Sequence, residues 1–566
     1  MKFLLIYLFI LPSSTQAELF TSIAHLKSLI DVHKEIPEII ESYIKIEENR
    51  LQTLQRLIES HRNKNKQMSS DGTNSLRNPI RAFSLIKHLV SDWSVIENLM
   101  KQNVADEFLR NLAESRMKQQ IKHPTDEDLS GAAAAIFRLQ DVYRLSTKDL
   151  ANGKIYNIDS NQTLSAKDCF LIGRAAYVAE DYYHTVLWMQ EAYDKIKKEN
   201  DPSHEDLQDI IEHLSFSLFK QGNVKRALLL AEELLETAPN HQRAASNIKW
   251  YENTLREEGF KPNEFRRNIP PVVNRREDDL VESNKERDIY EALCRNEVPV
   301  SIKELSKLYC YYKQDRPYLL LAPFKVEIMR FNPLAVIFRN VISDEEIDII
   351  QEMAQPLLKR ATVQNSVTGQ LETASYRISK STWLKSSDHE VVERINRRTD
   401  FMTNLEQETA EELQIANYGL GGHYDPHFDF ARKEETRSFE TLGTGNRIAT
   451  VLFYVVLLFT FIVFIKMSEP EIGGATVFTS LRTTVLPSKN DALFWYNLIR
   501  SGEGDLRTRH AACPVLVGDK WVANKWIHEA GQEFRRPCGL RTFDQEKYVG
   551  DLGGPEPENH ANISPF

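Results

Sequence analysis

Cysteine is scarce in this sequence, which holds five cysteines among 566 residues. A domain built on disulfides needs a much higher density of cysteines, so the sequence excludes a disulfide scaffold. A basic excess is also absent, because 71 lysines and arginines stand against 81 aspartates and glutamates, and the formal net charge is −10. A general nucleic-acid binder usually has the opposite balance, and we therefore expect no nucleic-acid partner.

The rest of the composition is that of an ordinary globular protein. Hydrophobic residues make up 42% and charged residues 27% of the chain, a balance that argues against extensive disorder. At roughly 150 residues per domain, the length predicts three to four domains.

The N-terminus has the features of a secretory signal peptide. Lys2 precedes a short apolar stretch, residues 3–11, and small residues follow at a plausible cleavage position. We expect removal of residues 1–17 and an oxidising lumen for the mature chain, where the sequons at Asn161 and Asn562 can carry glycans. The C-terminus has no retention signal of the Lys-Asp-Glu-Leu type, so another component must keep the protein in the endoplasmic reticulum if it stays there.

Residues 18–150 are predicted to be helical, because apolar residues recur at three- and four-residue steps. Such an apolar stripe needs a partner face, and the pattern fits both an intramolecular bundle and a dimerising coiled coil. Residues 62–79 are polar and are expected to form a loop between helices. The stripe includes Leu26, Ile30, Ile36, Ile40, Tyr43, Leu51, Leu54 and Ile58.

Residues 151–256 are predicted to form two helical hairpins of the tetratricopeptide type. In the second hairpin, Gly222, Ala227 and Pro239 stand at the intervals of that repeat. Two hairpins are fewer than a free-standing solenoid needs, so the region is a small module. Its many aromatic residues have two interpretations, a buried core or a groove for an extended, proline-rich peptide. The groove interpretation singles out Tyr177, Phe216, Phe219 and Trp250.

The segments that follow differ in character. Residues 257–319 begin with a charged stretch broken by Pro270 and Pro271 and are interpreted as a linker. Residues 320–550 contain short apolar runs typical of an antiparallel β sandwich, and residues 551–566 form a tail. Ser343 and Glu346 have the spacing of a capping box, which predicts that a helix begins there. The expected strands are residues 336–341, 414–419, 478–486, 492–495 and 520–526.

The segment around residues 417–430 carries the strongest candidates for chemistry. Residues two apart share one face of a strand, so His427 and Asp429 present an imidazole and a carboxylate to one metal ion. A second histidine from a distant strand completes a facial triad, and His510 is the candidate. Such a triad leaves coordination positions open for an organic co-substrate and oxygen, as in non-haem Fe(II) oxygenases.

Lys520 follows His510 by ten residues and begins an apolar strand that ends at Trp526. A cation at the far end of the pocket can pair with the distal carboxylate of a dicarboxylate co-substrate. An isolated lysine is usually a surface residue, and one His-x-Asp pair is weak evidence because His423 and Asp425 form another. The ordered set of His-x-Asp, a later His and then Lys in a β-rich region is much more specific.

The sequence resembles the collagen prolyl 4-hydroxylase alpha subunit (the procollagen-proline 4-dioxygenase family) over residues 18–550. The resemblance implies a multidomain α+β fold with helical dimerisation, tetratricopeptide-like peptide-binding and double-stranded β-helix (jelly-roll) oxygenase regions, in that order. It implies hydroxylation of peptidyl proline at C4 in collagen-like chains, coupled to decarboxylation of 2-oxoglutarate to succinate, with ascorbate to rescue oxidised iron. The resembling segments are residues 417–433, 443–454, 473–478, 494–504 and 508–538.

Residue roles carry over by position. The resemblance implies that His427, Asp429 and His510 bind Fe(II), that Lys520 binds the 2-oxoglutarate carboxylate, and that His423 is only a neighbour. Tyr418 and Trp526 resemble lesser residues of the cofactor pocket. The family's disulfides correspond to Cys294–Cys310 and Cys513–Cys538, which leaves Cys169 free.

The resemblance also implies an assembly. Family members form an α2β2 tetramer with protein disulfide isomerase, whose own retention signal keeps the complex in the endoplasmic reticulum lumen. The peptide module departs from the family, which has tyrosines where this chain has His213, Phe216 and Phe219.

An uncharged apolar run, residues 448–465, is the larger departure. Its length makes it a candidate membrane span, but residues 455–466, which are inserted relative to the family, are too few for an added spanning helix. A span would place the two halves of the metal triad on opposite sides of a membrane, so we expect none. Three interpretations stay open: an extended β hairpin, a gene-model or splicing artefact, and a true span.

An active hydroxylase is our leading hypothesis. A subunit that binds peptide but is catalytically impaired by the insert and a membrane-anchored protein are the alternatives.

Overall fold

The computed structural model of the chain describes residues 23–69, 79–118, 124–198, 204–280, 285–364, 370–435, 439, 442–455, 472–541 and 544–551. The chain forms two compact units, Ala24–Pro124 and a larger unit that contains Thr125–Phe566. The expected signal peptide, the sequon at Asn562 and the inserted residues 456–466 lie outside the described residues.

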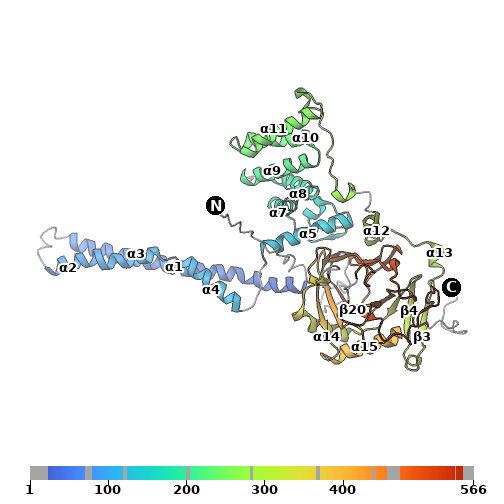
Figure 1. The fold of residues 1–566 in the computed structure, drawn as a ribbon. Coiled ribbons are helices and arrows are strands. Elements are labelled where there is room, and N and C mark those ends of the chain that lie inside the picture. Colours follow the sequence, from blue (N-terminus) through green and yellow to red (C-terminus); the bar gives the residue numbers. More distant parts are fainter. Residues whose placement is uncertain are drawn as a thin grey trace, which may run out of the picture. The chain divides into compact units, whose positions relative to one another are not determined.

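The smaller unit is helical, as predicted, and is arranged along one long helix, α1 (Figure 1). Tyr43 of α1 lies 5.5 Å from the ring of Phe108, and Lys64 forms an ion pair with Asp92 at 3.0 Å. The loop predicted for residues 62–79 is wrong in its first half, because α1 continues to Ser69. The elements are α1 (Ile23–Ser69), α2 (Pro79–Lys87), a π-helix (His88–Asp92), α3 (Trp93–Lys101) and α4 (Val104–Lys118).

Helix α5 (Asp126–Tyr143) belongs to the larger unit, so the compact units divide at Pro124, not at residue 150. A capping box at Thr125 starts the helix. Ala133 and Phe137 of this helix pack into the core of the peptide module, whereas its last turns, with Tyr143, pack into a core of the β-rich domain that follows. Gly421, at φ +67°, permits the close approach of α5, since a Cβ there would lie 2.7 Å from that of Ala135.

The described part of the peptide module contains the two predicted helical hairpins and two further helices, α6 and α11. Ser165 and Asp181 cap the two helices of the first hairpin, and Gly222, at φ +79°, makes the turn inside the second. Trp188 and Met189 lie at the centre of the module's core. The elements are α6 (Thr147–Ala151), β1 (Lys154–Ile155), β2 (Ile158–Asp159), α7 (Ala166–Val178), α8 (Tyr182–Ile196), α9 (His204–Lys220), α10 (Val224–Thr237) and α11 (Gln242–Glu257).

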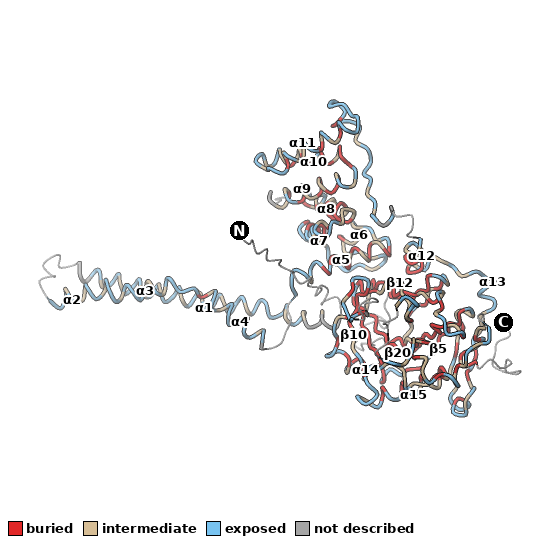
Figure 2. The backbone as a smooth tube through the Cα atoms, in the orientation of Figure 1, coloured by how far each residue is buried: buried red, intermediate tan, exposed pale blue. Residues whose placement is uncertain are grey.

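The β-rich domain, which becomes the candidate catalytic domain below, is the predicted antiparallel sandwich, with a nine-stranded and a five-stranded sheet. Side chains alternate along its strands. In β5, Val336 and Phe338 face the core under α14 and α15, whereas Ala335 and Ile337 face the core shared with Tyr418. Buried residues are concentrated in these strands, whereas α1 is largely exposed (Figure 2).

The nine-stranded sheet has the order β3-β4-β5-β17-β13-β20-β11-β10-β6, and the five-stranded sheet has the order β16-β15-β18-β12-β9. The first comprises β3 (Cys310–Lys313), β4 (Phe324–Phe331), β5 (Leu334–Arg339), β17 (Ala492–Tyr496), β13 (Arg447–Tyr454), β20 (Lys520–His528), β11 (Leu413–Tyr418), β10 (Lys380–Leu384) and β6 (Lys359–Arg360). The second comprises β16 (Thr483–Val485), β15 (Thr476–Phe478), β18 (His510–Ala512), β12 (His423–His427) and β9 (Arg377–Ile378). Two small ribbons pair β14 (Ile472–Gly473) with β19 (Val515–Val517) and β7 (Val363–Gln364) with β8 (Leu371–Glu372). The helices are α14 (Asp344–Ala354) and α15 (Glu390–Thr403).

Most of the expected strands and the helix start are confirmed. The capping box of Ser343 and Glu346 begins α14. The single strand expected over residues 478–486 is wrong, because Arg482 adopts φ 49° in a turn between β15 and β16. Pattern alone does not separate one strand from two strands of a tight hairpin when both are apolar.

The segment interpreted as a linker, residues 257–319, also carries structure. Its helix α12 (Lys285–Cys294) packs through Tyr290 and Leu293 against the catalytic core, and β3 forms an edge of the large sheet. A short helix, α13 (Ile302–Leu305), lies between them.

The disulfide pairing implied by the resemblance is wrong in this structure. Because α12 lies against the smaller sheet, Cys294 is bonded to Cys513, with Cα atoms 5.6 Å apart. Cys310 stands on an edge strand of the other sheet, and both Cys310 and Cys538 are free and exposed. Cys169 is free and buried, as expected.

The described part of the apolar run is a strand of the large sheet. Residues 447–454 form β13, which pairs with β17 on one side and β20 on the other. Val455 continues the pairing, because its N–H donates to the Trp521 carbonyl and its own carbonyl accepts a hydrogen bond from Gln351. A membrane span that begins at residue 448 is therefore excluded. Of the helices in the described ranges, none has the length and apolar character that crossing a bilayer needs.

Candidate active site

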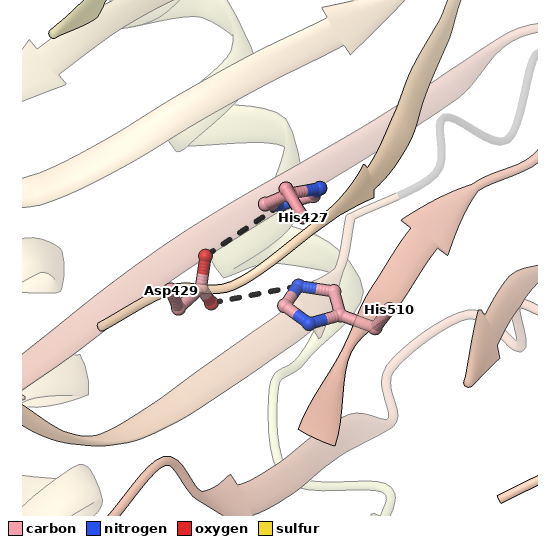
Figure 3. Close-up of side chains that lie close together, drawn as sticks. All are labelled: His427, Asp429 and His510. Carbon is pink, nitrogen blue, oxygen red and sulfur yellow. Dashed lines mark ion pairs between the residues drawn. The ribbon is translucent and has the colours of Figure 1, made fainter. Parts of the chain in front are cut away.

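Two neighbouring strands of the smaller sheet bring the predicted metal ligands together. β12 and β18 are antiparallel, and His427 lies opposite His510 in their register. Asp429 follows β12 by two residues and points between the two imidazoles (Figure 3). Its Oδ1 lies 3.6 Å from His427 Nε2, and its Oδ2 lies 3.6 Å from His510 Nε2.

Backbone carbonyl groups fix the orientation of both imidazoles. His427 Nδ1 lies 2.7 Å from the Asp425 carbonyl oxygen, and His510 Nδ1 lies 2.9 Å from that of Thr508. Each Nδ1 therefore carries the proton, and each Nε2 presents a lone pair to the site.

The protonation states of the histidine and aspartate side chains at this site favour binding of a cation. Burial lowers the pKa of His510 to about 4, so its imidazole is neutral. Burial alone would raise the pKa of Asp429, but the adjacent His510 and His427 outweigh it and keep that pKa well below its usual range. The donor atoms of the three residues lie within 4.8 Å of one another, and this donor set fits Fe(II).

A narrow cavity of about 40 Å³ extends from the triad and is lined by the other candidates. Lys520 lies in its wall, with Nζ 5.4 Å from the ring centre of Tyr418, and no carboxylate among the described residues forms an ion pair with that Nζ. Burial lowers the pKa of Lys520 to about 7. Trp526 also lines the cavity, and the guanidinium of Arg447 lies 4.0 Å from its ring centre. An anionic co-substrate would supply the missing partner of Lys520.

His423 takes no part in the triad. It is buried four residues before His427, and its Nε2 faces Asp425 Oδ1 at 3.4 Å. This places it as a neighbour of the ligands, as expected.

Family models match three consecutive parts of the chain. They are the N-terminal region of the prolyl 4-hydroxylase alpha subunit over residues 22–157, the prolyl 4-hydroxylase peptide-substrate-binding domain over 166–257, and the 2OG-Fe(II) oxygenase superfamily over 413–528. Prolyl 4-hydroxylase subunit alpha-1 of Caenorhabditis elegans is 57% identical over 97% of this chain and 96% of its own length. The human subunit alpha-1 is 43% identical over 96% of this chain and 99% of its own length.

The chain belongs to the prolyl 4-hydroxylase alpha-subunit family. It is a 2-oxoglutarate-dependent prolyl hydroxylase, with Fe(II) as its metal and 2-oxoglutarate as its co-substrate. Among solved structures, the viral collagen prolyl hydroxylase of Paramecium Bursaria Chlorella virus-1 matches 35% of this alpha subunit and 96% of that chain, with 24% identity and a TM-score of 0.27.

Several residues that line or support the site of this alpha subunit were not found from its sequence. Tyr424 stacks on His427, with ring centres 3.5 Å apart, and the Arg377 guanidinium lies 4.9 Å from the Tyr424 ring. Thr450 and Asn497 lie behind Asp429. A threonine inside the apolar strand β13 is the one signal that the sequence offered for this group.

The four aromatic residues predicted to bind peptide come together on the peptide module. Tyr177 of α7 contacts Phe216 of α9 at 5.9 Å between ring centres, and Trp250 of α11 contacts Phe216 at 6.4 Å and Phe219 at 4.5 Å. His213 joins the row through Tyr177 at 4.5 Å. We call these five residues the aromatic row.

Proposed function

We propose that this chain hydroxylates C4 of prolyl residues in collagen-like, proline-rich polypeptides, with Fe(II) held by His427, Asp429 and His510. The observation that supports it best is the joint placement of this triad and the buried cation Lys520 around one cavity. When bound, Fe(II) supplies the reaction of oxygen with 2-oxoglutarate, which yields succinate, CO2 and the oxidant for the prolyl C–H bond.

The chain's own residues orient and shield the reactants. The Lys520 ammonium pairs with the distal carboxylate of 2-oxoglutarate, and the backbone carbonyl groups of Asp425 and Thr508 keep both imidazoles turned toward the metal. Tyr418 and Trp526 line the cavity and exclude water from it. Ascorbate restores iron that has been oxidised without product formation.

The aromatic row binds the substrate chain outside the cavity of the metal site. Proline rings pack well on aromatic faces, and an extended polyproline helix loses little entropy on docking. Trp250 is 46% exposed, so its ring is accessible to such a chain. Three members of the row supply ring faces without phenolic hydroxyls: His213, Phe216 and Phe219. The row therefore selects its peptide substrate mainly by stacking on proline rings.

The smaller helical unit mediates self-association. Its described helices expose many large apolar side chains, which a second copy would cover in an α2β2 assembly with protein disulfide isomerase as the β subunit. That partner keeps the complex in the endoplasmic reticulum lumen. The exposed residues include Ile30, Ile40, Ile80, Phe83, Leu89 and Trp93.

The same compartment permits glycosylation. Asn161 is exposed in the turn between β2 and α7, with φ +54°, and its side chain is accessible for a glycan. We propose a glycan there and at Asn562.

The test is succinate formation from 2-oxoglutarate, with and without a Pro-Pro-Gly repeat peptide. The full-length chain is co-expressed with protein disulfide isomerase, and His427→Ala is the blank. Peptide-stimulated succinate that disappears in the blank is the expected result. No succinate from an assembled, soluble complex would overturn the proposal.

The apolar insert favours a second candidate function, a subunit that binds proline-rich peptide but is catalytically impaired. Val455 is a buried part of the sheet, so the deletion that separates the two candidates removes residues 456–466 and keeps Val455. Succinate formation that appears only after this deletion would support the impaired-subunit function.

A further inference from the structure

Three buried side chains form a chain of hydrogen bonds that ends at the carboxylate of Asp429. Thr450 Oγ1 donates to Asp429 Oδ2 at 2.8 Å, Asn497 Nδ2 donates to Thr450 Oγ1 at 2.9 Å, and Trp495 Nε1 donates to Asn497 Oδ1 at 2.8 Å. Thr450, Asn497 and Trp495 are each at most 1% exposed. We call this chain of hydrogen bonds the carboxylate relay.

The relay has only one possible direction. An indole N–H is a donor and never an acceptor, so Trp495 forces the amide oxygen of Asn497 toward itself. The amide NH2 of Asn497 then faces Thr450 and occupies a lone pair of its hydroxyl oxygen. The hydroxyl proton of Thr450 is left with Asp429 as its acceptor.

The relay comes from neighbouring strands of the large sheet, whereas the histidines come from the smaller sheet. Thr450 is in β13, and its partner across the β13–β17 ladder is Trp495, with Asn497 just beyond the end of β17. The carboxylate is thus tied to one sheet and the imidazoles to the other, and its position between them depends on the hydrogen bond from Thr450.

We propose that Thr450 and Asn497 are positioning residues that hold Asp429 in the orientation needed for metal binding. The Thr450 hydrogen bond occupies Oδ2 and favours a single-oxygen contact to the metal, which leaves more coordination positions for 2-oxoglutarate and oxygen. This inference rests on the proposed role of Asp429 as a ligand. It assigns function to residues that touch neither metal nor substrate.

The test measures metal affinity directly. Mn(II) is titrated into the metal-free, full-length complex, and the free ion is followed by electron paramagnetic resonance. Thr450→Val keeps the shape of the side chain and removes its hydroxyl, and we expect about tenfold weaker Mn(II) binding, within the range for lost supporting hydrogen bonds. Thr450→Ser restores the hydroxyl and should return the affinity to within about threefold of wild type.

Asn497→Leu gives an independent measurement that does not depend on the folding of the threonine variant. It frees the Thr450 hydroxyl to rotate, and we expect a smaller loss of affinity, about threefold. The double variant Thr450→Val/Asn497→Leu should bind no more weakly than Thr450→Val, because both changes act through one hydrogen bond.

The matched control is Thr399→Val. Thr399 is fully buried on α15, and its hydroxyl donates only to a backbone carbonyl, that of Ile395, at 2.8 Å. The Mn(II) affinity of the Thr399→Val variant should equal that of wild type. Mn(II) affinity of Thr450→Val within twofold of this control, or additive losses in the double variant, would overturn the proposal.

The outcome is separable from that of the proposed function. A wild-type complex that binds Mn(II), loses it in Thr450→Val and yet forms no succinate would refute the activity and support the relay. If His427→Ala binds Mn(II) as well as wild type does, the metal is not at the triad, and both proposals fail.

Discussion

In the proposed site, Lys520 is the residue that sets the conditions for co-substrate binding. Its side chain is 1% exposed, and burial lowers its pKa to about 7. A lysine of this kind is stable without a carboxylate only because it can lose its proton. A bound dicarboxylate favours the charged form and raises the pKa again.

The first prediction concerns pH. Above the pKa of about 7 in the free protein, 2-oxoglutarate must bring a proton to Lys520 as it binds, so its apparent Kd should rise about tenfold per pH unit. Below that pKa the ammonium is already present and the Kd should level off. Calorimetric titration of the Mn(II)-loaded complex at several pH values between about 6 and 9 measures this.

The control for this prediction is Lys520→Arg, whose guanidinium stays charged throughout. Its Kd should be weaker than that of wild type and independent of pH, because the pocket fits a lysine. A wild-type Kd that does not change between pH 7 and pH 9 would contradict the predicted titration.

The sequence pointed to the residues of the proposed site but not to the side chains that support them. His427, Asp429, His510 and Lys520 were found because ligand chemistry restricts residue type and spacing. Thr450 and Asn497 were not found, because a hydrogen bond between residues 47 positions apart follows no fixed spacing in the sequence. Register, set by the whole sheet, brings them together.

At the level of elements, local periodicity predicted the β5, β11, β17 and β20 strands and the hairpins of the peptide module. It did not predict that α12 packs on the catalytic domain, because a short amphipathic helix between charged segments has the same pattern as a solvated one. The contact of α12 with the smaller sheet also decides the disulfide.

The second prediction is the disulfide connectivity. Peptide mapping of the unreduced, alkylated complex should give a crosslinked pair that contains Cys294 and Cys513, while Cys310 and Cys538 are alkylated. A crosslink between Cys513 and Cys538 would contradict the structure. Cys294→Ser should lower the thermal stability of the catalytic domain, since the bond closes a loop over a sequence separation of 219.

The third prediction concerns the aromatic row, which extends across α7, α9 and α11. Trp250→Ala removes a ring that contacts both Phe216 and Phe219, and we expect the KM for a long Pro-Pro-Gly repeat peptide to rise about tenfold. The kcat should stay unchanged, because the row is outside the catalytic cavity.

Phe534→Ala is the matched control, since Phe534 is 94% exposed on the catalytic domain and contacts none of the row. It should leave the KM unchanged. An equal rise in KM for both variants would mean that general surface apolarity, and not the row, binds the peptide.

At the level of the whole molecule, the interior position of β13 decides how the apolar run is understood. Strand β13 is the fifth of nine strands, and its residues are buried between β17 and β20. Removing them into a bilayer would take apart the sheet that carries Lys520 and the carboxylate relay.

The fourth prediction is therefore that carbonate extraction of microsomes releases the full-length chain. A lumenal protein without a span is washed out with its partner, whereas a spanning protein stays in the pellet. A chain that resists extraction would contradict the proposed lumenal location. The control is the variant that lacks residues 456–466. Without the inserted apolar residues this variant has no span, so carbonate should release it from the microsomes if it folds.

The dual packing of α5 has a consequence for how such proteins arise. One helix completes the core of the peptide module with Phe137 and that of the catalytic domain with Tyr143, whose hydroxyl donates to the Pro514 carbonyl at 2.5 Å. Gene fusion or exon exchange that imported either part alone would leave a hydrophobic hole in the other. A chain that carried one part alone would have to cover the freed apolar face of α5 in another way.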